Sequence, residues 1–422
     1  MKVLWLCNLM PPAVAHVLGK EAGNKEGWLT GQLEKLLSHR KENGIELGLC
    51  FPIAPGSVPI KGSTEEFSYF GFYEDTVHPE KYDVELEEQL KKILQEFAPD
   101  IVHCFGTEYP HALAMSRVCE DKKKLLIGIQ GLCYKIADFY MADLPESIQK
   151  RYLLRDFLKR DNLVRQQRKY VLRGGFEKEA LKMARHVTGR TDWDKAAVAE
   201  VNPQAEYHFM NESLRSDFYK FRWQLNNCER YSIFLSQGNY PLKGLHYLLW
   251  ALPDILKQYP QTKVYVAGDV ITRYNTLPEK IKISSYGKYC LDLIRKERLA
   301  DKVCFLGKLD SAGMCERYLK SHVFLSASSL ENSPNSVGEA MLLGMPVVSS
   351  AVGGVANLIV NGEEGLLYPH QDMKALAAAI MRFFSDDEAA VAFGNRAGEH
   401  ARLTHDPEIN YRRLLEIYGE MT

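Results

Sequence analysis

The sequence predicts an α/β fold built from two Rossmann-like domains. Short apolar runs of strand length alternate with longer amphipathic stretches along the chain, as in a doubly wound parallel sheet. A length of 422 residues exceeds what one hydrophobic core normally organises, so two domains are the natural expectation. The polar stretch 218–229 follows the last apolar element of the first half and marks the predicted domain boundary.

Ten apolar runs are the predicted strands, five in each half. They are residues 2–7, 45–50, 100–104, 125–130 and 186–189, followed by 231–236, 263–267, 303–306, 322–326 and 346–350. Helical periodicity separates them most clearly at 86–97, 245–258 and 373–384. Ligands of such folds bind at the carboxyl ends of the strands, so we expect one in a cleft between the carboxyl ends of both sheets.

Composition excludes several classes of function. The net charge of −1 provides no global field for nucleic acid. The nine cysteines include no Cys-x-x-Cys pair, which favours a reducing compartment over a disulfide framework. No apolar run approaches the roughly 18–20 residues of a membrane helix. We therefore expect a cytoplasmic protein, with peripheral contact at the inner face of the membrane as a further option.

The most informative feature is a pair of glutamates, Glu331 and Glu339, separated by seven residues. Glu331 lies in the loop that leaves the strand 322–326, and Glu339 lies early in a helix predicted from about 336 to 343. Backbone N–H groups at a helix start favour an anion such as a diphosphate, and a carboxylate beyond them can accept hydrogen bonds from ribose hydroxyls. The alternative is a helix start that is acid-rich by chance.

This motif is followed by the strand Gly344-Met345-Pro346-Val347-Val348 and by Gly353-Gly354. In that order the segment resembles the donor site of retaining glycosyltransferases of family 4 (glycosyltransferase group 1 type), which have the GT-B fold. The resemblance is strong over about 305–365, moderate over 236–251 and weak before 220. It implies an acceptor-binding domain at 1–220 with a basic helical insert at about 145–183, a nucleotide-sugar-binding domain at 221–405, and a helix at 406–422 that returns to the first domain.

The resemblance assigns the donor residues one by one. Residues 237–244 are similar to a Gly-Arg-loop-Lys-Gly segment whose two cations hold the donor diphosphate. Lys243 matches the lysine, Asn239 stands at the arginine position, and Arg190 is a guess for the substitute cation. The backbone N–H groups of Asn335, Ser336 and Val337 would face the sugar or diphosphate, Glu331 the sugar hydroxyls and Glu339 the ribose. A surface turn is the alternative for Lys243.

Further residues are assigned by the same resemblance. Gly307, Lys308 and Leu309 are similar to a strand end that clasps the nucleotide base, and Gly27 matches a glycine loop that approaches phosphate or sugar. Residues 100–108 resemble Asp-Val-Val-His-x-His, but Phe105 replaces the second histidine. Glu108 and His111 could take over its polar role. His103 is either a sugar contact or a buried core histidine, and the core reading is slightly favoured.

We expect neither a cofactor nor a metal ion. Asp192 and Asp194 form an Asp-x-Asp pattern, which more plainly caps the following helix through Thr191 or Asp192. No cluster of His, Asp or Glu has the spacing of metal ligands in the sequence. The donor would be a nucleotide-diphosphate sugar, used as a substrate.

A basic stretch at residues 150–173 is the unusual feature of the first half. It carries nine lysines and arginines against two aspartates, with apolar residues interleaved. Such a stretch either contacts an anionic membrane and a lipid-linked glycan acceptor or is a solvated helix face.

The predicted function is transfer of a sugar with retention, in surface polysaccharide or glycolipid synthesis. A sugar-nucleotide epimerase of the same fold and a non-catalytic sugar-nucleotide-binding protein are the alternatives. A glycan phosphorylase would need pyridoxal phosphate and a much longer chain.

Overall fold

The computed structural model describes residues 1–20 and 27–422, with side chains of the second stretch described from residue 29 onward. These residues form two compact units. The first comprises residues 1–137, 169–215 and 404–422, and the second comprises residues 138–168 and 216–403. Residues 138–168, which include most of the basic stretch, thus group with the second unit, whereas the sequence prediction assigned the whole insert to the first.

The first unit is built on an eight-stranded sheet in the order β3-β4-β2-β1-β5-β6-β7-β8. All neighbouring strands are parallel except β3, which runs antiparallel to β4. The strands are β1 (Lys2–Leu6), β2 (Glu46–Ile53), β3 (Lys61–Ser63), β4 (Phe67–Tyr73), β5 (Ile101–Phe105), β6 (Leu125–Gly128), β7 (His186–Gly189) and β8 (Glu206–Phe209).

Side chains of this sheet alternate between two hydrophobic cores, one on each face. Val3 and Trp5 of β1 belong to a core that includes Tyr418, whereas Leu4 and Leu6 belong to the core on the other face. This period of two is the normal consequence of strand geometry, and burial on both faces explains the nearly continuous apolar strands.

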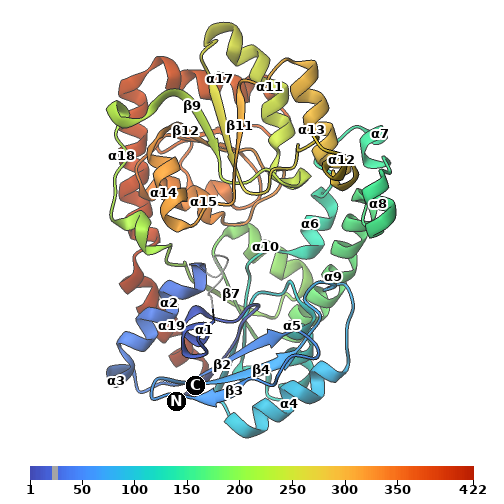
Figure 1. Ribbon diagram of the computed structural model, residues 1–422. Coiled ribbons are helices and arrows are strands. Elements are labelled where there is room, and N and C mark those ends of the chain that lie inside the picture. The colour runs from blue at the N-terminus through green and yellow to red at the C-terminus, as the bar shows by residue number, and fades with distance from the viewer. Residues whose placement is uncertain (21–26) are drawn as a thin grey trace. The chain divides into compact units, whose positions relative to one another are not determined.

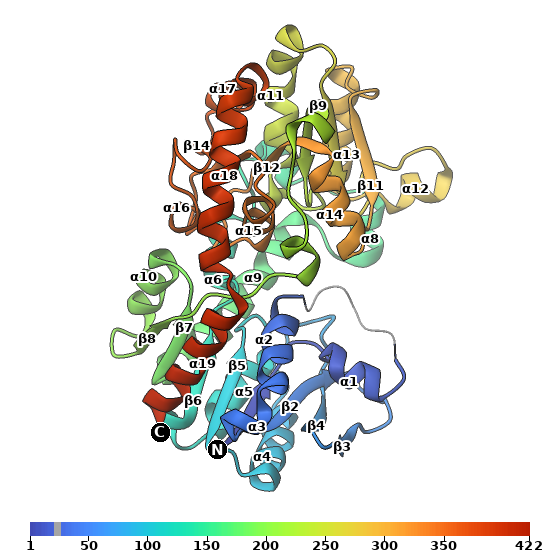
Figure 2. The same cartoon turned by 90° about the vertical axis from the view of Figure 1, so that its left-hand side faces the viewer.

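Helices cover both faces of the first sheet (Figures 1 and 2). They are α1 (Pro12–Val17), α2 (Gly27–Ser38), α3 (Arg40–Asn43), α4 (Glu85–Phe97), α5 (Pro110–Val118), α10 (Asp192–Val201) and α19 (Pro407–Met421). The C-terminal α19 packs against α2, and its Tyr418 hydroxyl accepts a 2.8 Å hydrogen bond from the indole of Trp5. The last helix, which the sequence prediction returned to the first domain, therefore makes these contacts within the first unit.

The second unit is built on a six-stranded sheet in the order β11-β10-β9-β12-β13-β14, parallel throughout. Its strands are β9 (Glu229–Leu235), β10 (Lys263–Ala267), β11 (Val303–Gly307), β12 (Ser321–Ser326), β13 (Val347–Ser350) and β14 (Leu366–Tyr368). Its helices are α7 (Glu146–Gln149), α8 (Leu154–Lys159), α11 (Leu245–Gln258), α12 (Leu277–Lys282), α13 (Ser285–Lys296), α14 (Ser311–Leu319), α15 (Asn335–Leu342), α16 (Val355–Leu358) and α17 (Met373–Ser385). Three divisions between the units fall within α6 (Cys133–Phe139), α9 (Leu163–Met183) and α18 (Asp387–Thr404), and the fourth lies between residues 215 and 216.

Each sheet has a topological switch point, where successive strands are added on opposite sides of the first strand. In the first sheet this point lies between β1 and β5, and in the second it lies between β9 and β12. Ligands of doubly wound folds bind just beyond the carboxyl ends of the strands at such a point. The loops after β1, β5, β9 and β12 are therefore where functional side chains are expected.

All ten predicted strands overlap strands of the structure, and the elements the prediction missed are β3, β4, β8 and β14. The first sheet therefore has three more strands than predicted. Strand β4 has the sequence Phe-Ser-Tyr-Phe-Gly-Phe-Tyr, whose aromatic residues favour a strand, and it pairs along its whole length with β2. Strand β14 has only three residues, and the four residues of β8 (Glu-Tyr-His-Phe) form no apolar run, so neither carries enough pattern to be recognised by itself.

Two further findings concern the chain as a whole. Within the described part, no helix combines the length and apolar character needed to cross a bilayer. All nine cysteines are described, and all are free thiols.

Candidate functional site

The centre of the candidate site in the second unit is an ion pair between Lys243 and Glu331. Lys243 ends the single turn η4 (Pro241–Lys243) after β9, and Glu331 lies in the loop after β12. The Lys243 ammonium is 2.5 Å from Glu331 Oε1, and the two side chains are 20% and 12% exposed. The Ser328 hydroxyl donates a 2.6 Å hydrogen bond to the same oxygen. The switch point of the second sheet thus carries one cation and one carboxylate in direct contact.

Two glycines hold the loop that carries Glu331. Gly244 and Gly353 have φ angles of 70° and 52°, in the left-handed region that favours glycine. A Cβ atom at Gly244 would lie 1.8 Å from the carbonyl oxygen of Ala327, and one at Gly353 would lie 1.8 Å from that of Glu331. The loop therefore packs closely against one glycine at Ala327 and against the other at Glu331, which explains why glycine occupies these positions.

Helix α15 begins directly beyond Glu331. The N–H of Val337 donates to the carbonyl of Pro334 at 2.9 Å, so this group is engaged within the first turn. Of the three predicted anion-facing N–H groups, those of Asn335 and Ser336 lie at the very start of the helix, where the dipole favours negative charge. Glu339 is buried, with 4% of its surface exposed, on the second turn.

The predicted base-contacting segment ends β11. Gly307 is the last residue of this strand, has a φ of 79°, and accepts a hydrogen bond from the N–H of Gly268 at 2.9 Å. Lys308 and Leu309 follow, and the Lys308 ammonium lies 3.2 Å from Asp269 Oδ1 at an exposed position. The segment thus places the backbone of Gly307 and one exposed lysine at the carboxyl edge of the sheet.

A cavity of about 430 Å³ adjoins the loop after β9. It is lined by Asn239 and Tyr240, by residues 269–271 after β10, and by Arg155 and Gln166 of the basic stretch. The Oδ1 atom of Asn239 is buried without a hydrogen-bond partner among the described residues. Because an unpaired buried amide oxygen is costly, this position is one that a bound molecule could satisfy.

The first unit has its own polar network at the switch point between β1 and β5. Nδ1 of His111 lies 2.6 Å from Glu74 Oε2, and Nε2 lies 2.9 Å from Asn8 Oδ1. The Asn8 amide donates to Glu108 Oε2 at 3.2 Å, and the N–H of Gly131 donates to Glu108 Oε1 at 3.0 Å. Because both ring nitrogens of His111 face oxygen atoms, the ring and both carboxylates are held in fixed positions. The predicted Glu108 and His111 are thus brought together.

Beside this network is a cavity of about 360 Å³, lined by Asn8, Leu9, Leu29, Glu108, Tyr109, Gln130 and Arg173. Arg173 donates from Nε to the carbonyl of Glu108 at 2.9 Å, and its guanidinium lies over the rings of Tyr109 and Tyr170. A cation, a carboxylate and an aromatic ring in a cavity of this size can contact a sugar-sized molecule.

Two predicted residues have other surroundings. His103 is fully buried, its Nδ1 is 2.9 Å from the Tyr418 hydroxyl, and its ring stacks on Phe105. Burial lowers its pKa to about 3. These contacts support the core reading. Arg190 belongs to the first unit and is paired with Glu212 at 2.6 Å, so the structure gives this guanidinium a carboxylate partner inside that unit.

The remaining predictions have mixed outcomes. Gly27 is the first residue of α2, whereas residues 23–26 of the same predicted loop lie outside the described residues. Thr191 caps α10 by accepting a hydrogen bond from Asp194 N, and the Asp194 carboxylate faces the N–H of Thr191 in a capping box. The helix-capping interpretation of the Asp-x-Asp pattern is therefore confirmed.

Sequence reasoning missed four residues of these sites, which are Asn8, Glu74, Ser328 and Arg173. Asn8 and Glu74 follow strands β1 and β4, and position after a strand is the signal that could have identified them. Glu74 was beyond reach because β4 itself was not predicted. Arg173 was counted only as one charge of the basic stretch.

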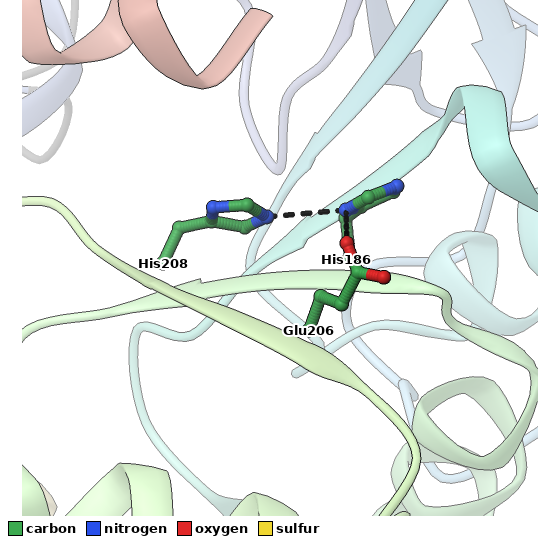
Figure 3. A group of neighbouring side chains, drawn as sticks. All are labelled: His186, Glu206 and His208. Atoms are coloured by element: carbon green, nitrogen blue, oxygen red, sulfur yellow. Dashed lines mark hydrogen bonds and ion pairs between the residues drawn. The ribbon is translucent and has the colours of Figure 1, made fainter. Parts of the chain in front are cut away.

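The structure also brings together a group that could hold a metal ion, which the sequence spacing did not reveal. His186, Glu206 and His208 lie on β7 and β8, and their ligand atoms are all within 4.8 Å of one another (Figure 3). Burial lowers the pKa of both histidines. This is the one such group among the described residues.

Comparison with solved structures defines the fold class as GT-B. The chain is similar to sucrose-phosphate synthase from Thermosynechococcus elongatus, with a TM-score of 0.71, 18% identity, and coverage of 100% of this chain and 99% of the other. It is also similar to HepE of Anabaena, solved in complex with UDP and glucose, with a TM-score of 0.65, 16% identity and full coverage of both chains. Because the sequence identities are below 25%, these structural similarities establish the fold alone.

Sequence comparison finds a family match in the second half of the chain. Residues 216–400 match the family Glycosyl transferases group 1. A curated relative is the glycogen synthase of Mycobacterium tuberculosis strain H37Rv, 29% identical over 164 residues, which are 39% of this chain and 36% of the relative. The chain spans about a third to a half of the length of the curated relatives it matches.

Proposed function

We propose that this protein is a retaining glycosyltransferase of family 4, which moves a sugar from a nucleotide-diphosphate donor to an acceptor hydroxyl. The observation that carries the proposal is the Lys243–Glu331 pair, at the switch point of the region that matches the family Glycosyl transferases group 1 and directly before helix α15. A cation for the leaving diphosphate and a carboxylate for sugar hydroxyls are the two charges that such a donor requires.

Donor binding would exchange the partners of this ion pair. The Lys243 ammonium would turn its charge to the diphosphate, and Glu331 would accept hydrogen bonds from sugar hydroxyls. The start of α15 at Asn335 and Ser336 would face the diphosphate, and Glu339 the ribose. Gly307, Lys308 and Leu309 would contact the base. Because Ser328 and the two glycines fix the loop beforehand, little reorganisation is needed when charge develops.

The proposed chemistry needs no pair of hydrolase-type carboxylates. In a front-face retaining reaction the bond from the anomeric carbon to the leaving phosphate oxygen breaks, the acceptor oxygen bonds to that carbon, and its proton passes to the leaving diphosphate. The protein then contributes positioning and stabilisation of developing negative charge. Lys243 is the residue we expect to supply the latter, without a bound metal ion or other cofactor.

The acceptor would bind the first unit. Glu108 and His111 line or support the cavity of about 360 Å³, and Arg173 and Tyr109 offer a cation and a ring to it. We expect a glycan acceptor, with Glu108 accepting a hydrogen bond from one of its hydroxyls. A carboxylate suits this role because hydrogen bonds to a charged acceptor are stronger than those between neutral groups.

A lipid-linked glycan acceptor in surface polysaccharide or glycolipid synthesis is the finer proposal. It is supported by α8, where Leu154, Phe157 and Leu158 are 54%, 65% and 63% exposed beside lysines and arginines. An exposed apolar face flanked by cations is typical of peripheral contact with anionic lipids at the cytoplasmic surface. Sedimentation with phosphatidylglycerol vesicles should capture the wild type, and the double variant L154S/F157S should stay in solution; equal capture of both would contradict this contact.

The first experiment is a thermal-shift panel in EDTA with UDP, GDP, ADP, CMP and their sugar conjugates. A ligand that binds the native state raises the melting temperature by mass action. We expect a shift with one nucleotide family, reduced in Glu339→Ala and unchanged in the control Glu363→Ala. If no nucleotide shifts the melting temperature, even with magnesium, the proposed donor site is wrong.

A non-catalytic sugar-nucleotide-binding protein is the second candidate. It is favoured by Asn239 at the position of a family arginine and by Phe105 at that of a family histidine. Such a protein would bind the nucleotide without turnover. An epimerase of the same fold would convert the donor with no acceptor present, whereas a transferase would only hydrolyse it slowly, so incubation of donor alone followed by NMR separates the three.

A further inference from the structure

A cluster in the first unit joins His186, Glu206 and His208 (Figure 3). His186 is the first residue of β7 and is paired in register with Glu206, the first residue of β8. His208 lies two residues further along β8, so its side chain shares a face with that of Glu206. The register of two parallel strands therefore brings together side chains that are 20 and 22 residues apart in sequence.

The separations of the ligand atoms fit coordination of a small divalent ion. His186 Nδ1 is 3.1 Å from His208 Nε2 and 3.4 Å from Glu206 Oε2. In a tetrahedral zinc site with ligands about 2.0–2.1 Å from the metal, neighbouring ligand atoms are roughly 3.3 Å apart. Two imidazole nitrogens and a carboxylate oxygen are a donor set that zinc accepts readily.

The outer contacts of the group also match those of a metal site. Glu420 of α19 lies 3.0 Å from Nδ1 of His208 and can hold that N–H, which leaves the lone pair of Nε2 directed to His186. A metal-bound histidine typically donates its other N–H to a carboxylate in this way. Arg185 holds the Oε1 oxygen of Glu206, so the Oε2 oxygen is the one that faces the histidines.

We propose that His186, Glu206 and His208 bind one divalent transition-metal ion of the zinc type, with a water molecule as the remaining ligand. The ion would have a structural role. His186 and Glu206 lie at the amino ends of β7 and β8, opposite the carboxyl edge that carries the switch point, and β8 is the terminal strand of the sheet. The ion would tie this short edge strand to β7, and through Glu420 to α19. The proposal is independent of the sugar-transfer function.

The test is a zinc titration of the EDTA-treated full-length protein in competition with a chromophoric chelator. We expect one equivalent to bind, with affinity reduced more than about 100-fold in H186A/H208A. Glu206→Gln changes an exposed residue without loss of volume, so it should fold normally and weaken binding at least 10-fold. Glu420→Gln should weaken binding by roughly 10-fold by removing the partner of His208.

Two controls separate this site from other ligands of the chain. His78→Ala removes an exposed histidine, and Cys304→Ser removes an exposed thiol; neither should change zinc affinity. Cobalt added in place of zinc should give the visible absorption of a four-coordinate site, absent in Glu206→Gln. The proposal is overturned if the wild type takes up no zinc when the chelator is present at less than about 100 equivalents of the protein. It is also overturned if Glu206→Gln and H186A/H208A bind zinc as tightly as the wild type.

Discussion

The two switch points of this protein place charge at the same position of two related sheets but stabilise it differently. In the second unit, Lys243 and Glu331 form a direct, partly exposed ion pair whose loop is fixed by glycines and Ser328. In the first unit, Glu108 is connected through Asn8 to the buried pair His111–Glu74. The ion pair of the second unit can exchange its partners when an anion binds. The network of the first unit is closed and presents one carboxylate, that of Glu108, to a cavity.

The largest expected effect is on the stability of the first unit. Glu74→Gln removes the carboxylate that faces His111, and the two side chains are 4% and 1% exposed. Losing a buried hydrogen bond to a charged group costs about 1.5–3 kcal/mol of unfolding free energy. Urea denaturation should show this loss, with the exposed Glu66→Gln as a control. A loss below 1 kcal/mol would mean that the network does not stabilise this unit.

The corresponding change in the second unit should affect activity more than stability. Lys243→Ala is expected to lower kcat/KM by roughly 10²- to 10³-fold, the usual cost of removing a group that stabilises developing charge. Initial rates with the donor identified by thermal shift measure this, with the exposed Lys257→Ala as control. Wild-type rates in Lys243→Ala would remove this residue from the proposed site.

A third prediction concerns pH and a buried acid behind the first network. Burial raises the pKa of Glu177 to about 8. The hydrogen bonds from Thr107 and from the N–H of Tyr134 act in the opposite direction, but burial is the larger effect. The folded state therefore binds a proton more tightly than the unfolded state, and the stabilising contribution of the neutral acid is lost as pH rises from about 4.5 through 8. Glu177→Gln should match the wild type near pH 5 and exceed it by on the order of a few kcal/mol at pH 9. If the variant and the wild type differed in unfolding free energy by the same amount at both pH values, the prediction would be wrong.

The presented carboxylate of the first unit gives a smaller and more specific effect. Glu108→Gln should raise the KM for the acceptor by about 10- to 100-fold, the equivalent of one hydrogen bond to a charged group, and leave nucleotide affinity unchanged. Steady-state kinetics with both substrates varied separates the two quantities. A change in nucleotide affinity alone would place Glu108 on the donor side instead.

The smallest effect is expected at the edge of the second sheet. Lys308 and Asp269 form an ion pair whose side chains are 79% and 57% exposed. Such pairs contribute about 0–1 kcal/mol, so Lys308→Ala should leave the urea midpoint nearly unchanged. The ratio of the UDP and GDP affinities is then measured in the wild type and in the variant. Because folding is unchanged, a change in this ratio would report on the base contact.

How far the sequence determined these features depends on the distance over which their signals extend. The fold class, the ten predicted strands, the cap of α10 and the helix start beyond Glu331 follow from local patterns of apolar residues and capping groups. Glu331 could be chosen as a site residue because it follows a recognisable strand, and Lys243 because residues 237–244 resemble the family's Gly-Arg-loop-Lys-Gly segment. Their direct contact was not predicted, since it depends on β9 and β12 being neighbours in the sheet.

Tertiary structure alone decided the features that rest on strand order and register. Strand β4 places Glu74 against His111, and the pairing of β7 with β8 places His186 against Glu206 and His208. Residues 138–168 pack with the second unit although they interrupt the first in sequence. The physical reason is the same in each case: local propensity and periodicity determine which segments are strands or helices, but neighbouring segments in space are selected by burial of whole faces, which no local pattern records.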